Sequence, residues 1–575
     1  MQFQNDVEQH DNEHGQGKGE RGDSRLAADP PRSARGLKTH HWGGMRLPRL
    51  RRLRQDDIVV VEQEDVRHAV LGTAVGNFME WFDFGIYGYL TIVMTTVFTQ
   101  GMPRSIGLLV MLLGFAVSFL ARPLGGFILG PLGDRIGRQK VLFATMSVMA
   151  LSTSLIGVMP SAAQIGLWAP IPLYVLKIIQ GFSTGGEYAG AATYVSEFSP
   201  DKRRGYYSSW LDVGSYLGFA CGAGAVALTT YVSQRYWGPD AMVNGGWRIP
   251  FFMAVPLGAL AIYLRVRIPE TPHFEEEGDA EESRPRLRRR GRWSLAMLSP
   301  EARDKRVFGH HGTMGLLRNF HREIILGIMI VAAGNTVSYT LTSYMPTYLG
   351  NEMGAGPVTS AAATIPVLVL VAVLLPIVGA LSDRIGRRPV FTMAVVGTLV
   401  LMLPAFMLLH THTSWGLHLG LVLVALPTSA YICVMASAIP ALFPTSSRFA
   451  GMAAAYNVGV SLFGGTAPLI IQALIEATGN RYVPAWYAMF FACIGGVAIW
   501  MVPETSGKHL MGSMPAVETR AEAATIVATQ DDIPAKDLHT MPVEAIAAAW
   551  KEPDRDVHAP VEGAEAAGDA HPPQH

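Results

Sequence analysis

The sequence predicts an all-α membrane protein with twelve transmembrane helices, arranged as two related halves of six helices each. Three observations lead to this prediction. The 575-residue chain is 49% hydrophobic and only 16% charged, its apolar residues gather in long runs, and one loop motif occurs twice. Soluble globular domains carry about 25% charged residues, whereas long apolar runs with few charges are typical of membrane spans.

The apolar runs have the length that a bilayer requires, since a transmembrane helix needs about 20 residues. In the first half we place helices at 68–97, 106–130, 141–160, 168–196, 206–231 and 248–266. In the second half we place them at 324–349, 358–382, 390–410, 415–441, 450–475 and 483–503. A soluble core does not explain so many apolar segments, so the chain is expected to cross a membrane many times.

Polar segments flank and separate the two sets of helices. We expect a disordered cytoplasmic tail at 1–67, a cytoplasmic central loop at 268–323 and a polar cytoplasmic tail at 506–575. The two six-helix halves are then 68–267 and 324–505. The last segment shows no sustained heptad repeat, so it does not predict a coiled coil.

Arginines and lysines set the expected orientation. They cluster in the loops after the second, fourth, eighth and tenth helices and are sparse in the alternate loops. By the positive-inside rule, both termini then lie in the cytoplasm. The basic N-terminal stretch lacks the pattern of a signal peptide, and we expect a multi-pass protein of the cell inner membrane.

A loop motif recurs at equivalent places in the two halves. The loop after the second helix reads GPLGDRIGRQK (130–140), and the loop after the eighth reads GALSDRIGRRP (379–389). Its glycines allow two helix ends to approach, and its aspartate can pair with arginines or cap a nearby helix. We therefore predict a cytoplasmic gate formed by Gly130, Asp134, Arg135, Gly137, Arg138, Gly379, Asp383, Arg384, Gly386 and Arg387. The alternative is that the arginines serve only to orient the chain.

Away from the ends of its expected spans, the first half holds six charged residues: Glu80, Asp83, Arg122, Lys177, Glu187 and Asp212. A charge at mid-membrane costs about 2.5–3.5 kcal/mol on insertion scales, so each one needs a partner or a function. Arg122 is a candidate partner for Glu80 or Asp83. We predict that Glu80, Asp83 or Glu187 exchanges a proton during transport, with Glu80 first and Arg122 as the mobile partner. The alternative is a static ion pair that holds the helices together.

The first helix also presents a polar and aromatic face. Asn77, Glu80, Phe84 and Tyr87 follow a spacing of three to four residues, with Asp83 at the edge of the face they share. We predict that this face lines the substrate path, together with Trp81, Asn335 and Tyr339. Aromatic rings can hold a quaternary ammonium group by cation–π attraction, so the path suits a small zwitterion. The alternative is that the rings serve helix packing.

Several motifs resemble a known family. The doubled loop motif resembles the signature of the major facilitator superfamily. Six further stretches resemble its metabolite:proton symporter family: MEWFDFGIY (79–87), RPLGG (122–126), QGFSTGGEY (180–188), WRIPF (247–251), PETP (269–272) and YMPTYL (344–349). Two more, SSWLD (208–212) and MASAIPALFPT (435–445), are most similar to the proline/glycine betaine osmosensory symporters within that family.

The resemblance covers 68–505 and implies a major facilitator fold. It implies proton-coupled import, by alternating access, of compatible solutes such as proline, glycine betaine or ectoine. It also implies that Asn77, Glu80, Phe84 and Tyr87 lie along the transport path.

Two other functions stay open: a proton symporter for a small carboxylate such as α-ketoglutarate, citrate or shikimate, and a non-transporting membrane sensor. A carboxylate carrier would call for more unpaired cations than Arg122 and Lys177. The sequence contains no recognisable nucleotide-binding loop or catalytic constellation, so we expect no enzyme activity. We expect no metal and no cofactor beyond the coupling proton. The expected partners are a small-molecule substrate and the lipid bilayer, without nucleic acid, and the expected state is a monomer.

Overall fold

A computed structural model gives the fold. It describes residues 41–42, 45–46, 58–136, 138–266, 320–511, 513 and 515–529, which all belong to one compact unit, His41–His575. Residues 268–319 of the predicted central loop, and most of both predicted tails, lie outside the described residues.

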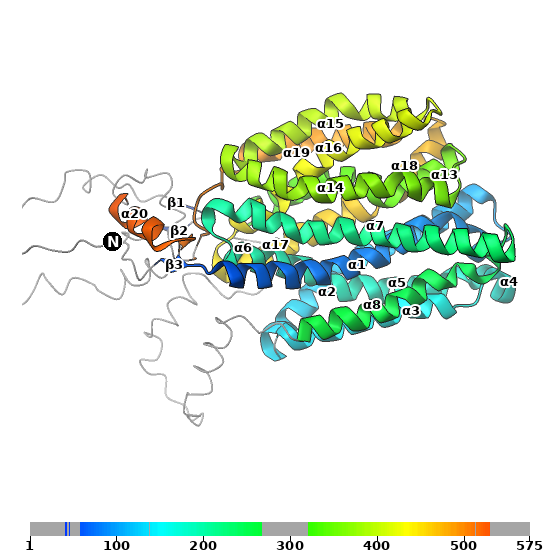
Figure 1. Ribbon diagram of the computed structural model, residues 1–575, viewed down its shortest axis with the longest axis horizontal. Helices are drawn as coiled ribbons and strands as arrows, with labels where there is room; N and C mark the ends of the chain where they lie inside the picture. Colours follow the sequence, from blue (N-terminus) through cyan, green and yellow to red (C-terminus); the bar gives the residue numbers. More distant parts are fainter. Residues whose placement is uncertain are drawn as a thin grey trace, which may run out of the picture. The chain divides into compact units, whose positions relative to one another are not determined.

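The described chain is almost entirely helical (Figure 1). The first half contains α1 (Gln63–Phe98), α2 (Arg104–Ile136), α3 (Arg138–Val158), α4 (Ala162–Ile165), η3 (Gly166–Trp168), α5 (Pro170–Thr184), α6 (Glu187–Phe198), η4 (Asp201–Arg203), α7 (Arg204–Trp237), η5 (Met242–Gly246) and α8 (Arg248–Val266). The second half contains α12 (His321–Tyr339), η7 (Thr340–Tyr344), α13 (Met345–Glu352), α14 (Pro357–Ile385), α15 (Arg387–Leu409), α16 (Ser414–Ala438), η8 (Pro440–Leu442), α17 (Thr445–Gly459), η9 (Val460–Gly465), α18 (Ala467–Thr478) and α19 (Val483–Met501).

Each of the twelve expected segments coincides with one of these helices or with a run of them. By length and composition, nine of the described helical segments can cross a membrane, and a tenth is added if the bent pair Phe143–Val158 and Ala162–Trp168 forms one span. The remaining expected spans correspond to α5 with α6 and to α8. The chain is therefore a multi-pass membrane protein.

The fourth expected segment, 168–196, is wrong as a single helix. It is split at Gly185 and Gly186 into α5 and α6. A side chain at Gly185 would collide with the carbonyl oxygen of Arg122 on α2, so only glycine allows this close approach. The Gly185 carbonyl also accepts a hydrogen bond from the Asn457 amide of the second half, at 2.5 Å. A partner from a neighbouring helix thus satisfies the backbone at the break.

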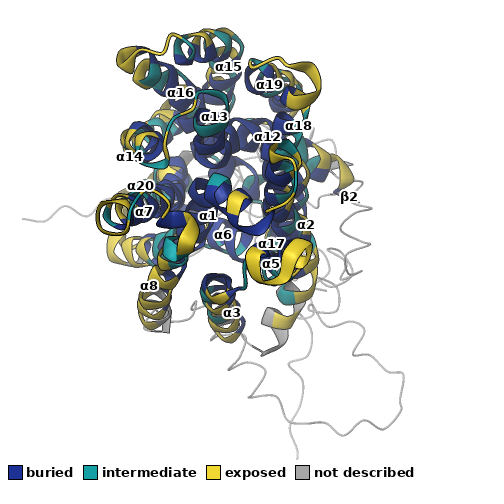
Figure 2. Cartoon of the chain, turned by 90° about the vertical axis from the view of Figure 1, so that its right-hand side faces the viewer, coloured by how far each residue is buried: buried dark blue, intermediate teal, exposed yellow. Residues whose placement is uncertain are grey.

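The two halves pack against each other through matching helices. The fifth span of the first half, α7, lies along the eighth span, α14, and the second span, α2, contacts the eleventh span through α17, η9 and α18. If the two halves are interchanged, each of these pairings becomes the other. This symmetry is expected of a structure built from a repeated unit. Viewed nearly end-on in Figure 2, α1, α6, α12 and α17 lie in the buried centre.

The outer surface of the helices is apolar. Large side chains such as Val373, Phe490 and Leu228 are 56%, 61% and 60% exposed. Exposed tryptophans lie near the helix ends, for example Trp237 and Trp500. An apolar band with aromatic residues at its borders is the surface that a bilayer covers.

The segments that precede the first helix and follow the last helix in the sequence meet at one end of the bundle. Strand β3 (Val59–Val60), which precedes α1, pairs in parallel with β4 (Ala516–Val517), which follows α19. Helix α20 (Arg520–Thr529) packs on this pair through Ile58, Val517 and Ala523. We call this end of the bundle the strand end. A separate hairpin joins β1 (His41–Trp42) to β2 (Met45–Arg46).

The predicted tail boundaries therefore require correction. Helix α1 begins at Gln63 and β3 at Val59, so the ordered chain starts before residue 67. Likewise, chain beyond residue 506 forms β4 and α20 instead of an unstructured tail. Hydropathy did not reveal these segments because they are held by backbone pairing and a small apolar cluster.

Candidate functional site

Two buried charges form the centre of the candidate site. Arg122 on α2 forms an ion pair with Glu80 on α1, and neither side chain is exposed to solvent. Of the two partners open to Arg122 in the sequence, the structure selects Glu80. Charge compensation of this kind is what a charge inside a membrane span requires.

Aromatic rings from both halves surround the pair. The Arg122 guanidinium lies 4.4 Å from the ring centre of Phe119, 5.2 Å from that of Phe84 and 5.5 Å from that of Trp81. Tyr339, from α12 of the second half, meets Trp81 at 5.8 Å and Phe119 at 5.2 Å. The predicted rings Trp81, Phe84 and Tyr339 thus form one cluster around a cation, and α2 contributes Phe119 to it.

Several polar atoms of this cluster have no hydrogen-bond partner in the described part of the chain. Among the described residues, no hydrogen bond reaches Nε or Nη1 of Arg122, Oε2 of Glu80 or the hydroxyl of Tyr339. Buried polar groups are normally hydrogen-bonded, because an unpaired one costs about 1–3 kcal/mol. Donors and an acceptor left open beside aromatic rings are the groups that a polar ligand with an apolar body would engage.

The remaining predicted residues of the first helix are fixed by neighbouring helices. The Asn77 amide donates to the carbonyl of Leu211 at 2.9 Å and to the Ser215 hydroxyl, and it accepts from the Trp81 indole at 3.2 Å. Tyr87 donates to the carbonyl of Met111 at 2.7 Å. Asn77 therefore orients Trp81, whereas Tyr87 is directed toward α2.

Asp83 lies apart from Arg122, in a polar chain of its own. Its Oδ2 accepts from Thr153 on α3 at 2.6 Å, and Thr153 accepts from Gln180 on α5 at 2.8 Å. Gln180 in turn accepts from the Lys177 ammonium at 2.9 Å. Lys177 also lies 4.1 Å from the ring centre of Tyr87. This series of hydrogen-bonded side chains has the carboxylate of Asp83 at one end and the ammonium group of Lys177 at the other. It lies next to the aromatic cluster.

Two predicted residues are buried outside these clusters. Glu187 is the first residue of α6, directly after the glycine break. Asn335, one turn before Tyr339 on α12, donates to its own helix at the carbonyl of Val331, at 3.2 Å. Both are less than 5% exposed.

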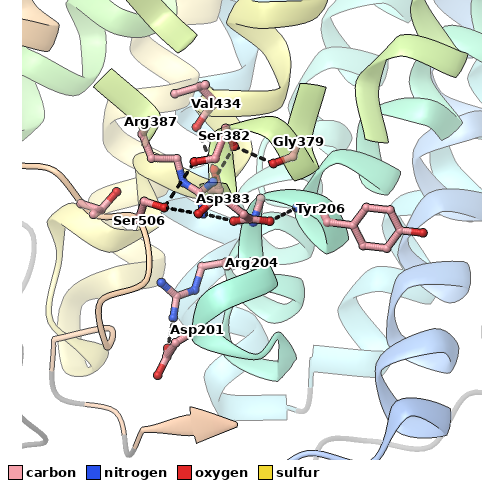
Figure 3. A network of polar contacts seen from close by, with 12 residues as sticks. Asp201, Arg204, Tyr206, Gly379, Ser382, Asp383, Arg387, Val434 and Ser506 are labelled. Carbon is pink, nitrogen blue, oxygen red and sulfur yellow. Dashed lines mark hydrogen bonds and ion pairs between the residues drawn. The ribbon is translucent and has the colours of Figure 1, made fainter. Parts of the chain in front are cut away.

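The second copy of the loop motif connects the two halves at the strand end (Figure 3). Asp383, in the last turn of α14, accepts hydrogen bonds from the backbone N–H groups of Gly205 and Tyr206, both at 2.8 Å. These groups belong to the first turn of α7, in the other half. Arg387 donates to the same carboxylate at 2.8 Å. Asp383 thus pairs with an arginine and caps a helix, the two possibilities that the sequence offered.

The motif's glycines account for the close contact. A side chain on Gly379 would meet the carbonyl oxygen of Gly205. Gly386 separates α14 from α15 at a φ of 104°, a backbone conformation that favours glycine. Arg384 is exposed and does not join the network. In the first copy, Gly137 and the side chains of Asp134, Arg135 and Arg138 lie outside the described residues, and Gly130 lies within α2.

Sequence reasoning missed the residues that follow the last helix. Glu504 accepts from the backbone N–H groups of Arg387 at 2.9 Å and Arg388 at 3.0 Å, which begin α15. The Ser506 hydroxyl donates to the Asp383 carbonyl at 3.0 Å. One signal was present: the triplet Pro-Glu-Thr follows both the sixth and the twelfth helix, at 269–271 and 503–505.

A further cross-half contact was also missed. Arg448 of α17 donates to Glu197 of α6 at 2.6 Å and to the carbonyl of Met511 at 2.7 Å. Arg448 is fully buried. The sequence shows this arginine only as one of the positive charges that orient the chain.

Comparison with known proteins gives the family. The model of the family described as "Sugar (and other) transporter" matches residues 69–515. The chain belongs to this transporter family. It is 54% identical over 491 residues, 85% of this chain and 94% of the relative, to the ectoine/proline transporter ProP of Corynebacterium glutamicum. It is 37% identical over 85% of its length to the glycine betaine/proline/ectoine/pipecolic acid transporter OusA of Dickeya dadantii, covering 93% of it. The proline/betaine transporter of Escherichia coli K12 is 37% identical, over 83% of this chain and 91% of that relative.

Solved structures confirm the fold. The proton:xylose symporter XylE of the major facilitator superfamily, bound to 6-bromo-6-deoxy-D-glucose, aligns with a TM-score of 0.59 over 78% of this chain and 98% of its own. A partially occluded inward-open conformation of XylE from E. coli aligns with a TM-score of 0.57, over 78% of this chain and 100% of that chain. The identities are 17% and 18%, so these structures speak for the fold alone. The predicted major facilitator fold is confirmed.

Proposed function

We propose that this transporter imports small zwitterionic compatible solutes, such as proline, glycine betaine or ectoine, together with protons. One observation carries the proposal: a buried Arg122–Glu80 pair with open polar atoms, enclosed by aromatic rings of both halves. The names of the relatives, which are transporters of ectoine, proline and betaine, support the same class of substrate.

The chemistry of the site suits both ends of a zwitterion. The open N–H groups of Arg122 can bind a carboxylate, which the guanidinium fork recognises well. The rings of Trp81, Phe119 and Tyr339 can hold the ammonium end by cation–π attraction, worth about 2 kcal/mol when desolvated. Tyr339 comes from the second half, so a bound solute draws the two halves together.

Proton coupling follows from competition for Arg122. A substrate carboxylate that binds Arg122 weakens the bond to Glu80, and the released carboxylate then takes up a proton. In this scheme Glu80 and Arg122 are the primary coupling pair. Asp83, linked to Lys177 through Thr153 and Gln180, and Glu187 at the glycine break are the secondary coupling candidates.

The contacts at the strand end act as a gate in this proposal. Asp383 and Arg387 hold α14 against the start of α7, and Arg448 holds α17 against α6. The equivalent first copy of the motif would serve the same gate. The strand end faces the cytoplasm, both termini lie on that side, and the protein works as a monomer in the cell inner membrane. It is not an enzyme and uses no cofactor other than the proton.

Uptake into proteoliposomes tests the proposal. The purified full-length chain is reconstituted, and accumulation of labelled proline, glycine betaine, ectoine and α-ketoglutarate is measured with and without an inward proton gradient. We expect gradient-dependent accumulation of the zwitterions and none of α-ketoglutarate. Preference for α-ketoglutarate would indicate the carboxylate symporter instead, and no uptake of any solute would indicate a membrane sensor. Accumulation that ignores the gradient would contradict proton coupling.

A further inference from the structure

A further buried carboxylate, Asp212 on α7, has no role in the mechanism described so far. It is 4% exposed. The hydroxyl of Tyr188 on α6 donates to both of its oxygens, at 3.2 Å and 3.1 Å. The Ser215 hydroxyl lies 3.5 Å from Oδ1. All of these partners are neutral.

Among the described residues, the titratable and polar groups near Asp212 on the surrounding helices contain no base. They are Tyr188 on α6, Ser215 and Tyr216 on α7, Tyr456 on α17 and Cys433 on α16. Within the described part of the chain, Asp212 forms no ion pair with any lysine, arginine or histidine. An ionised carboxylate held away from water without a counter-charge is several kcal/mol less favourable than a neutral one. The arrangement therefore suits a carboxyl group that carries a proton.

The partners of Asp212 differ chemically from the partner of Glu80. Arg122 can only donate hydrogen bonds, so it serves an ionised Glu80. The hydroxyls of Tyr188 and Ser215 can each donate or accept, so they serve Asp212 with or without its proton. Asp212 can therefore change its protonation state without a rearrangement of its neighbours, whereas Glu80 must first leave Arg122.

Hydrogen bonds connect Asp212 to the proposed substrate site. The Trp81 indole donates to Asn77, and the Asn77 amide donates to Ser215, which lies beside Asp212. A ligand that moves Trp81 thus acts on the surroundings of Asp212 through two intervening side chains.

Asp212 is equally connected to the contact between the halves. The ring of Tyr188, which donates to Asp212, stacks on the ring of Tyr456 in the second half, with centres 4.0 Å apart and planes 12° apart. Tyr188 cannot hold this stack once α6 and α17 separate. Separation of the halves at Tyr188 and Tyr456 therefore removes a contact that shields Asp212 from water.

We propose that Asp212 is a second proton-binding residue of the transport cycle, protonated while the Tyr188–Tyr456 contact is closed and releasing its proton to water when that contact opens. The step is a simple acid–base exchange: the carboxyl group loses a proton to water on one side of the membrane while the Tyr188–Tyr456 contact is open, and it regains one from the opposite side after that contact has closed. This inference rests on the proposed proton symport and adds a residue to it.

Substitution of Asp212 in reconstituted full-length protein tests the inference. Asp212→Asn keeps the shape and the hydrogen bonds of a neutral carboxyl group but cannot release a proton. Two rates are compared: accumulation of labelled proline driven by a pH gradient, and exchange of labelled for unlabelled proline at equal pH. We expect accumulation to fall at least tenfold more than exchange, and the pH dependence of exchange to flatten. Asp240→Asn, at an exposed aspartate after α7, is the matched control and should leave both rates unchanged.

The outcomes separate this inference from the proposed function. Absence of gradient-driven uptake by the unaltered protein would overturn the symport itself. Normal uptake by the unaltered protein, with accumulation and exchange in Asp212→Asn reduced equally or not at all, would overturn only the role of Asp212. If the asparagine variant does not fold, Asp212→Glu keeps a titratable group at an altered position. An unchanged pH profile in that variant would also contradict the inference.

Discussion

Loss of the Asp383 charge should open the strand end of the transporter. Asp383→Asn keeps one carbonyl oxygen, which can accept from either Gly205 or Tyr206, but it loses the second acceptor and the charge that Arg387 faces. Hydrogen bonds to a charged group contribute about 1.5–3 kcal/mol each, and a helix N-terminus adds about 0.5 kcal/mol for a nearby anion. Since asparagine retains part of this, we expect a net loss of about 2–3 kcal/mol from the closed arrangement.

A loss of this size changes the ratio of closed to open molecules by about 30- to 150-fold, because about 1.4 kcal/mol corresponds to a factor of ten. The native Cys433 offers a reporter. It is buried on α16, and its neighbour Val434 lies beside the Asp383 network (Figure 3). With the exposed Cys221 and Cys493 replaced by serine, its alkylation rate by a maleimide measures opening.

We expect alkylation of Cys433 to be at least tenfold faster in Asp383→Asn. The matched control is Arg384→Gln, which alters an exposed charge of the same motif and should leave the rate unchanged. A rate in Asp383→Asn within twofold of the unaltered protein, in a sample that remains folded, would refute the gate at this position. Equal acceleration by both variants would mean that only the general charge of the loop matters.

Three further changes test other parts of the structure. Glu80→Gln should abolish proton-driven accumulation. It should also shift the KM for proline, since Glu80 shares Arg122 with the substrate. Intact accumulation in this variant would exclude Glu80 as the essential proton carrier. Tyr339→Phe removes a hydroxyl without a partner among the described residues, so KM should rise about fivefold, the equivalent of about 1 kcal/mol, with little change in kcat; an unchanged KM would place the hydroxyl outside the site. Burial alone raises the pKa of Glu504, but the backbone N–H groups that it binds outweigh burial and lower that pKa below its ordinary value. Glu504→Gln should therefore cost about 1 kcal/mol of stability near pH 7. The difference in melting temperature between this variant and the unaltered protein should narrow as the pH falls through the lowered pKa of Glu504.

Hydropathy and the doubled motif sufficed to predict the fold. Twelve segments were placed, and only 168–196 failed as a single helix. The failure has a physical cause: the break at Gly185 depends on a carbonyl of α2 and an amide from the other half, 272 residues away. The local sequence does not predict such contacts. A Gly-Gly pair is also tolerated within a membrane helix, so its presence does not by itself indicate a break.

The composition of the site was predictable, but its pairing was not. Helical spacing placed Glu80 and Asp83 three residues apart, with one arginine in reach of either. Which carboxylate meets Arg122 depends on the rotation of α1 against α2 and α3, and the structure directs Asp83 to Thr153 instead. Likewise, Glu504 binds backbone N–H groups of α15, which every residue except proline carries. The sequence of α15 therefore gives no sign that Glu504 binds there.

The contacts between the halves lie at three levels along the helices, and their distribution bears on how the transporter moves. At the strand end the halves are joined by Asp383 and Arg448, and at the opposite side Tyr89 of α1 donates to Thr364 of α14 at 2.5 Å. Between them lies the central level, where Tyr216 and Ser338 are 2.7 Å apart. Since contacts close the bundle above and below Glu80 and Arg122, the described arrangement shields the site from both sides of the membrane. Opening either side breaks one set of contacts and can spare the other, which is the requirement for alternating access. The strand end carries the charged contacts and the opposite side a neutral one. In the absence of a substrate, opening toward the strand end should therefore cost more free energy, and the salt-sensitive barrier of the cycle should lie at that end.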